Sequence, residues 1–192
     1  SAPPPPPPPP GPTAVSAGGE HSCGTTSAGA AHCWGNGQAG QLGTGATTVS
    51  AGPAAVAGGH TFAQLSAGGP TTCALTAEGK AWCWGQGNSG RLGNGQSGSR
   101  SRPDPVSGGL TFVSIGTGAN YSCAVATGGA AYCWGFGANG GLGTGFAAHS
   151  VQEPVAVVGG HTFASITVGV SHTCALTPDG TAYCWGENNS GQ

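Results

Sequence analysis

Residues 172–186 read HTCALTPDGTAYCWG, and three other stretches of the 192-residue chain follow the same pattern. These stretches are HSCGTTSAGAAHCWG at 21–35, TTCALTAEGKAWCWG at 71–85 and YSCAVATGGAAYCWG at 121–135. Each copy begins about 50 residues after the previous one, and short apolar runs alternate with glycine-rich turns. No stretch has a helical period, so the sequence predicts an all-β fold made of tandem units.

Each unit has room for four short strands, as in the blade of a β-propeller. We expect the first strand at 62–65, 112–115 and 163–166. The two cysteines of each unit mark the second and third strands. We expect the fourth strand at 53–56, 105–106 and 154–158. Proline leads this last run, which suits an outer edge strand because proline lacks the N–H that a neighbouring strand needs.

The domain organisation follows from the repeats and from an unbroken run of prolines, Pro3 to Pro10. Residues 1–12 are expected to form a polyproline II rod or linker, because such a run cannot pair in a sheet. The four repeats are expected at 13–60, 61–110, 111–161 and 162–192. The last is incomplete, since its fourth strand is missing. About four blades are therefore expected to belong to a larger ring or assembly, or to a longer parent chain.

Composition excludes several classes of partner. The chain has 4 Lys and Arg, 6 Asp and Glu, and a formal net charge of −2. Nucleic acid binding needs a basic surface that four cationic residues do not supply. No apolar run is long enough for a membrane-spanning helix. We therefore expect no nucleic acid partner and no membrane insertion.

The eight cysteines are spaced to form four pairs within hairpins. The two cysteines of each unit lie ten positions apart, with glycine just after the midpoint, where a three-residue hairpin loop needs a left-handed residue. The facing cysteines would then be close enough for a disulfide. The expected pairs are Cys23–Cys33, Cys73–Cys83, Cys123–Cys133 and Cys174–Cys184. The alternatives are buried free thiols and a zinc site, although the short ligand spacing of zinc ribbons is absent.

The stretch at 172–188, with tails such as Gly40-Gln41-Leu42-Gly43-Thr44-Gly45, resembles a repeat of the regulator of chromosome condensation family. The resemblance covers about residues 13–192. It implies a β-propeller of four-stranded blades, usually seven. A secreted, disulfide-containing branch of the family matches the cysteines best. The proline run resembles hydroxyproline-rich glycoproteins, which implies sugars on the rod.

Other motifs give no catalytic, cofactor or metal site. The pattern Gly-x-Gly-x-x-Gly at 35–40 and 85–90 lacks the helix that a dinucleotide site needs. Glycines in this turn are expected to supply positive φ, and Asn188 takes the place of Gly37, Gly87 and Gly137. His21 and His172 share a repeat position and are expected to be polar residues on a blade face. No catalytic triad is apparent, so we do not expect an enzyme.

Two sequons and the proline run are candidate glycosylation sites. They comprise Asn120, Asn188, Pro3, Pro4, Pro5, Pro6, Pro7, Pro8, Pro9 and Pro10. With oxidised cysteines and little charge, they point to an extracellular or cell-surface protein. The sequence therefore predicts a structural or assembly module of a cell wall, surface coat or filament, acting through protein contacts. The alternative is a secreted binding or enzyme-inhibitor propeller that uses blade-face loops.

Overall fold

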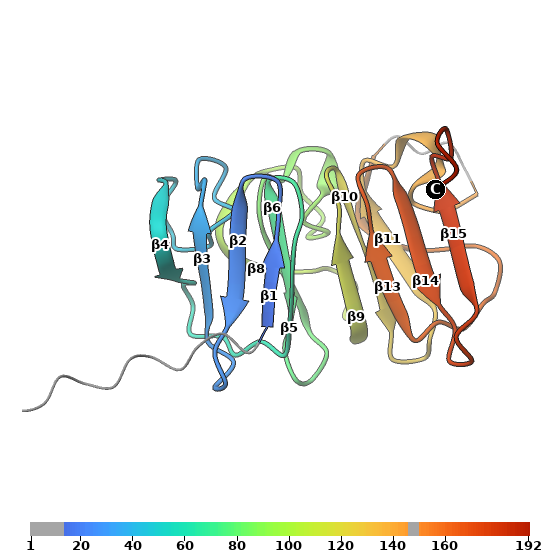
Figure 1. Cartoon of the computed structure of the whole chain (residues 1–192), viewed down its shortest axis with the longest axis horizontal. Helices are drawn as coiled ribbons and strands as arrows, with labels where there is room; N and C mark the ends of the chain where they lie inside the picture. Colours follow the sequence, from blue (N-terminus) through green and yellow to red (C-terminus); the bar gives the residue numbers. More distant parts are fainter. Residues whose placement is uncertain (1–13, 146–149) are drawn as a thin grey trace, which may run out of the picture.

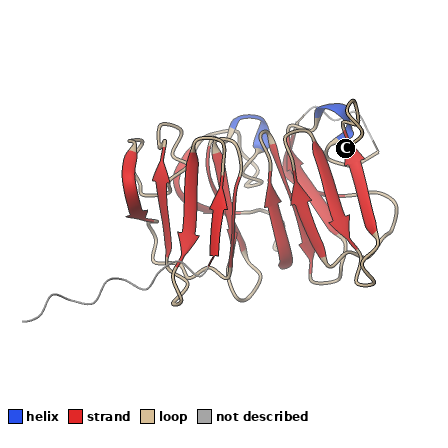
Figure 2. Cartoon of the chain, in the orientation of Figure 1, coloured by secondary structure: helices blue, strands red, loops and turns tan. Residues whose placement is uncertain are grey.

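The computed structural model describes residues 14–145 and 150–192, and this part of the chain is almost entirely β-structure (Figure 2). Four antiparallel sheets follow one another along the chain, in agreement with the all-β propeller-type fold predicted from the repeats (Figure 1). The only helical segments described are short 3-10 turns at Asn88–Gly90 and Ala138–Gly140. The expected polyproline II segment and its candidate prolines lie outside the described residues.

Each sheet is a simple meander, in which neighbours in the chain are neighbours in the sheet. Sheet 1 contains β1 (Ala14–Ala17), β2 (His21–Thr25), β3 (Ala31–Gly35) and β4 (Ser50–Ala55). Sheet 2 contains β5 (Gln64–Ala67), β6 (Thr71–Leu75), β7 (Ala81–Gly85) and β8 (Arg100–Pro105). Sheet 3 contains β9 (Phe112–Thr117), β10 (Tyr121–Ala126), β11 (Ala131–Gly135) and β12 (Val151–Ala156). Sheet 4 contains β13 (Ser165–Val168), β14 (His172–Leu176) and β15 (Ala182–Gly186).

The first strands of the four sheets lie next to one another, so the sheets are arranged like successive blades (Figure 1). Turns between the first and second strands join the sheets directly. The Gly19 N–H donates to the Gly68 carbonyl at 2.8 Å, and the Gly69 N–H donates to the Gly118 carbonyl at 3.0 Å. The prolines of β4, β8 and β12 lie on the last strand of each sheet, as expected for an edge.

The second and third strands of every sheet form a hairpin with the two cysteines directly opposite each other. Cys23 pairs with Cys33 in the strand register, and the same holds for the other three sheets. All four disulfides are present, each with a Cα–Cα distance of 4.1 Å. The glycine of each turn has a positive φ between 77° and 87°. This left-handed residue closes the turn that fixes the cysteine register.

The first strands of sheets 2 and 4 begin two residues later than the sequence predicted, because the phenylalanine before them is paired elsewhere. The Phe62 N–H donates to the Gly29 carbonyl at the tip of the preceding hairpin, at 2.8 Å. Phe163 makes the same bond to Gly129, at 2.8 Å. Both phenylalanine side chains are buried. They therefore tie one sheet to the next and do not start a strand.

The glycine position occupied by Asn188 in the last copy does not require positive φ, contrary to our expectation. Gly87 has a φ of −106° and Gly137 a φ of −109°. The constraint is steric, since a Cβ on Gly87 would lie 2.1 Å from the Gly98 carbonyl oxygen. Positive φ without glycine occurs instead at Ser89 and Asn139, two residues further along each turn.

Candidate protein-interaction faces

Each sheet has two unlike faces, because side chains alternate across a strand. We call the side that carries the disulfide the disulfide face, and the side that carries the tryptophan of Cys-Trp-Gly the tryptophan face. The disulfide face of each of the first three sheets packs on the tryptophan face of the next sheet, and we call each contact a junction. The buried apolar clusters of the described chain correspond to these three junctions.

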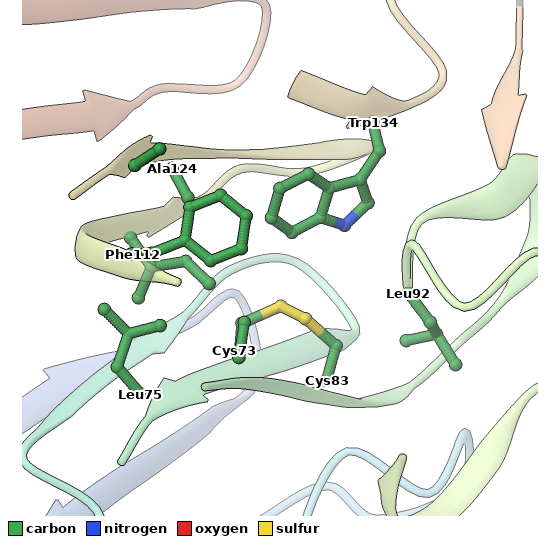
Figure 3. Close-up of a cluster of buried hydrophobic side chains, with 10 residues drawn as sticks. Cys73, Leu75, Cys83, Leu92, Phe112, Ala124 and Trp134 are labelled. Carbon is green, nitrogen blue, oxygen red and sulfur yellow. A yellow bond between two sulfur atoms is a disulfide. The ribbon is translucent and has the colours of Figure 1, made fainter. Parts of the chain in front are cut away.

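The junction between sheets 2 and 3 shows the arrangement clearly (Figure 3). The disulfide Cys73–Cys83 and Leu75 of sheet 2 lie against Phe112 and Trp134 of sheet 3. Leu92, from the loop after β7, closes one side of the cluster. Cysteine sulfurs and one leucine thus replace the large aliphatic core that the glycine-rich composition does not provide.

The junction between sheets 1 and 2 also contains a buried chain of hydrogen bonds. His21 Nε2 lies 2.7 Å from Thr72 Oγ1, and Thr72 Oγ1 donates to the Gln41 carbonyl at 2.9 Å. Trp84 Nε1 donates to the same carbonyl at 3.0 Å. Because the single Thr72 hydroxyl proton goes to Gln41, His21 must donate through Nε2–H. Its Nδ1 atom is buried without a hydrogen-bond partner.

The junction between sheets 3 and 4 repeats this chain with tyrosine in place of histidine. The Tyr121 hydroxyl donates to Thr173 Oγ1 at 3.0 Å, and Thr173 Oγ1 donates to the Gly141 carbonyl at 3.2 Å. Trp185 Nε1 donates to that carbonyl at 3.0 Å. Burial raises the pKa of Tyr121, which keeps the phenol protonated. In the middle junction, Trp134 Nε1 has no hydrogen-bond partner.

His21 is therefore not a polar residue on a blade face, as the sequence suggested, but a buried junction residue with 4% exposure. The chain of hydrogen bonds could not be inferred from composition, because its acceptor is a backbone carbonyl 20 residues away from His21. A signal did exist in the repeats, where Thr72 and Thr173 follow the position shared by His21 and Tyr121. That pattern places two hydrogen-bonding side chains side by side on adjacent sheets.

Acid is expected to loosen the first junction. Desolvation lowers the pKa of His21 from 6.5 to about 4, because a buried imidazolium would have an N–H without an acceptor. The unfolded chain therefore binds more protons between about pH 6.5 and 4, and stability falls with pH in that window, by up to about 3 kcal/mol at its lower end. Urea unfolding at pH 7 and pH 4.5 measures this loss.

The matched variant is His21→Tyr, which copies the residue that stands at this position in sheet 3 and cannot gain a proton in this range. Its stability should lose the part of the pH dependence that the wild-type chain shows between pH 6.5 and 4. An unchanged pH dependence in His21→Tyr would contradict the assignment to His21.

The loop after the third strand approaches the next tryptophan so closely that only glycine fits. Gly43 has a φ of +69°, and a Cβ there would lie 2.7 Å from Trp84 Nε1. Gly59 has a similar φ of +66°, but a Cβ there would meet no atom within 4 Å. The two positions separate backbone strain from steric conflict with the neighbouring sheet.

Gly43→Ala is expected to lower the free energy of unfolding by about 2–4 kcal/mol, since strain and steric conflict add. Gly59→Ala should lose only the strain, about 1 kcal/mol. Chemical denaturation of both variants at pH 7 measures the difference. Equal losses would show that the approach of Gly43 to Trp84 does not contribute to stability.

Two faces of the described chain lack the neighbour that their counterparts have. On the disulfide face of sheet 4, Leu176 is 44% exposed, whereas the equivalent Leu75 is 3% exposed. Cys184 is also exposed, while the cysteines of the other three sheets are fully buried. On the tryptophan face of sheet 1, Val15 is 69% exposed, against 3% for Ile115 at the same position of sheet 3.

The predicted glycosylation sites lie apart from these junctions. Asn188 is exposed in the turn after β15, and Asn120 is partly exposed in the turn between β9 and β10. Both stay predictions. Within residues 14–145 and 150–192, no cluster of three His, Cys, Asp or Glu side chains is arranged for a metal ion. In the same part of the chain, no helix is long and apolar enough to cross a membrane.

Two other features complete the surface. The turns after β1, β5, β9 and β13 line a shallow hollow of about 310 Å³, and none of its lining residues is charged. Sheet 2 carries a polar patch on β8, where Arg100 forms an ion pair with Asp104 at 2.9 Å. Asn94 and Gln96 also bond to this pair. Neither feature contains a catalytic arrangement.

Comparison with known proteins gives one family. The Regulator of chromosome condensation (RCC1) repeat profile matches residues 28–75, 78–125 and 128–176. A second profile of the same repeat matches residues 13–41, 62–91 and 163–192. Together these matches cover most of the chain. A search of curated protein sequences finds no significant match.

Solved structures with the same fold include human WBSCR16, with 22% identity, a TM-score of 0.81, and coverage of 90% of this chain and 46% of the other. Yeast RCC1 (Prp20), solved bound to Kap60, has 23% identity and a TM-score of 0.76 over 91% of this chain and 43% of the other. The ectodomain of the Physcomitrella patens receptor kinase CR4 has 23% identity and a TM-score of 0.60 over 93% and 39%. The chain thus spans less than half the length of these structures.

Proposed function

Because the chain belongs to the RCC1 repeat family, we propose that it is an extracellular structural or assembly module that acts through protein–protein contacts. Its setting would be a cell wall, surface coat or filament. Family membership and fold are consistent with a protein-binding role, since yeast RCC1 was solved in complex with Kap60. The chain's own residues point to contacts made by sheet faces, because the described part has no catalytic cluster and no metal cluster.

The observation that carries the extracellular part of the proposal is the use of disulfides as core. Three of the four disulfides are fully buried at junctions, and the described residues contain no free cysteine. A junction with two reduced thiols would have a looser contact, and a thiol-rich core of this kind is rare in reducing compartments. The moss receptor ectodomain shows that the fold also occurs in an extracellular setting.

Sugars on the chain would suit this role, since the protein has little charge to keep it soluble. We propose Asn188 as the more accessible of the two sequons, because it is exposed in a turn. Modification of Pro3 to Pro10 is part of the same proposal. Removal of N-linked and O-linked sugars from the native protein, followed by intact mass measurement, tests both.

Location is the direct test of the proposed function. Antibodies raised against residues 14–192 should label intact, unpermeabilised cells of the source organism, and the protein should be recovered from wall or coat material with its disulfides closed. Recovery only from the cell interior, with reduced cysteines, would overturn the proposal.

The second candidate is a secreted binding or inhibitor propeller. The polar patch around Arg100 and Asp104 favours it, because fixed charged and amide groups on one loop side suit recognition of a soluble partner. A single saturable partner that is lost on Arg100→Ala, with no recovery from wall or coat material, would favour this candidate over the structural role.

A further inference from the structure

The two exposed faces are the two halves of one junction. In the three junctions of the described chain, a disulfide face always meets a tryptophan face. The disulfide face of sheet 4 and the tryptophan face of sheet 1 are the pair left over. The first is the donor of a disulfide and a leucine, and the second offers the strand positions that cover such a disulfide elsewhere.

The match extends to individual residues. Cys73 Sγ lies 3.6 Å from Ser122 Oγ across the middle junction, and Ser22 of sheet 1 occupies the position of Ser122. Trp34 occupies the position of Trp84 and Trp134, and it is only partly buried. Val15 occupies the position of Ile115, which packs in the middle junction. Sheet 1 therefore presents the same kinds of side chain that receive a disulfide face inside the chain.

Shape and charge agree with this match. A hollow of about 260 Å³ lies between β13 and β14 of sheet 4, lined by Ser165, Ile166, Thr167, Cys174, Ala175 and Leu176. None of these six residues is charged, and neither are Val15, Ser22 and Trp34. An uncharged, largely apolar strand surface loses free energy on burial, and exposed apolar faces of this kind are interaction sites.

We propose that the disulfide face of sheet 4 binds the tryptophan face of sheet 1 in a second copy of this chain. The inference rests on the proposed assembly role and names its partner. Contact between two unlike faces is heterologous, so copies join head to tail, closing into a ring if the rotation allows it and extending into a fibre if it does not. The new junction repeats the three that already hold the chain together.

Two charge substitutions test the proposal. Val15→Asp places a carboxylate on the tryptophan face of sheet 1, and Leu176→Asp places one on the disulfide face of sheet 4. Both side chains are exposed in the single chain, so each variant should fold. Val49→Asp is the control, because Val49 is also well exposed but lies in the loop before β4.

Sedimentation velocity should show that the wild-type chain and Val49→Asp associate as concentration rises from about 1 to 100 µM, whereas each face variant stays at 18.3 kDa. Mixing the two face variants is the decisive step. Val15→Asp keeps an intact sheet 4 face and Leu176→Asp an intact sheet 1 face, so the mixture should form a pair through one junction.

A wild-type chain that stays monomeric throughout this range would overturn the proposal. So would association of Val15→Asp alone, because that result means sheet 4 binds another sheet 4. Failure of the mixture to pair, with both variants carrying four disulfides by intact mass, would do the same. None of these results bears on surface labelling of cells, so the proposed function is tested separately.

Discussion

Trp84→Ala is expected to lower the free energy of unfolding by about 3–5 kcal/mol. Trp84 is fully buried in the junction between sheets 1 and 2, where it packs near Leu42 and the disulfide Cys23–Cys33. The change removes this packing and also the indole N–H that bonds the Gln41 carbonyl. Since the Thr72 hydroxyl then remains as a donor to that carbonyl, the loss comes mostly from the cavity.

Trp34→Ala is the matched control, because Trp34 holds the same position in sheet 1 but is only partly buried. It should cost much less, on the order of 1 kcal/mol, since fewer contacts are lost. Chemical denaturation at low protein concentration measures both variants. Equal losses would mean that the junctions do not determine stability.

Replacing the buried disulfide Cys123–Cys133 by two alanines is expected to cost about 4 kcal/mol. Opening the loop of a disulfide with a sequence separation of 10 contributes about 2.5–3 kcal/mol in the chain-entropy model. Both cysteines are fully buried in the junction between sheets 3 and 4, so removing two sulfurs also leaves a cavity. Thermal and chemical unfolding of the double variant measure the sum.

The disulfide Cys174–Cys184 provides the comparison, because its sequence separation is also 10. The chain-entropy contribution is therefore the same, but Cys184 is exposed and little packing is lost. Its double alanine variant should lose only about 2.5–3 kcal/mol. A larger loss here than at Cys123–Cys133 would contradict the assignment of burial to the junctions.

The fold could be predicted from the sequence because its information is local and repeated. Spacing of ten between cysteines, with Gly29 and its equivalents after the midpoint, fixes the hairpin register. The proline-led strands could be placed at the edge for a similar reason. The phenylalanine positions were misplaced, since the bond from Phe62 to Gly29 joins two sheets and has no signature within one repeat.

The junctions could not be predicted at the level of atoms. Which faces meet depends on close approaches between sheets, such as that of Gly18, where a Cβ would lie 2.2 Å from the Gly68 carbonyl oxygen. The buried role of His21 follows from the same packing, because Thr72 reaches it only when sheets 1 and 2 are in place. Repeat comparison shows that these positions are equivalent but not what covers them.

The central claim is that stacked junctions bury three disulfides and leave the fourth on an open face. The order in which the disulfides are reduced tests it most directly. The chain at low concentration is treated with a mild reductant, new thiols are alkylated over time, and each pair is quantified by peptide mass spectrometry. Cys174–Cys184 should open first, at least about tenfold faster than the others, because reduction depends on access to a sulfur. Equal rates for all four, or earlier opening of Cys73–Cys83, would contradict the account.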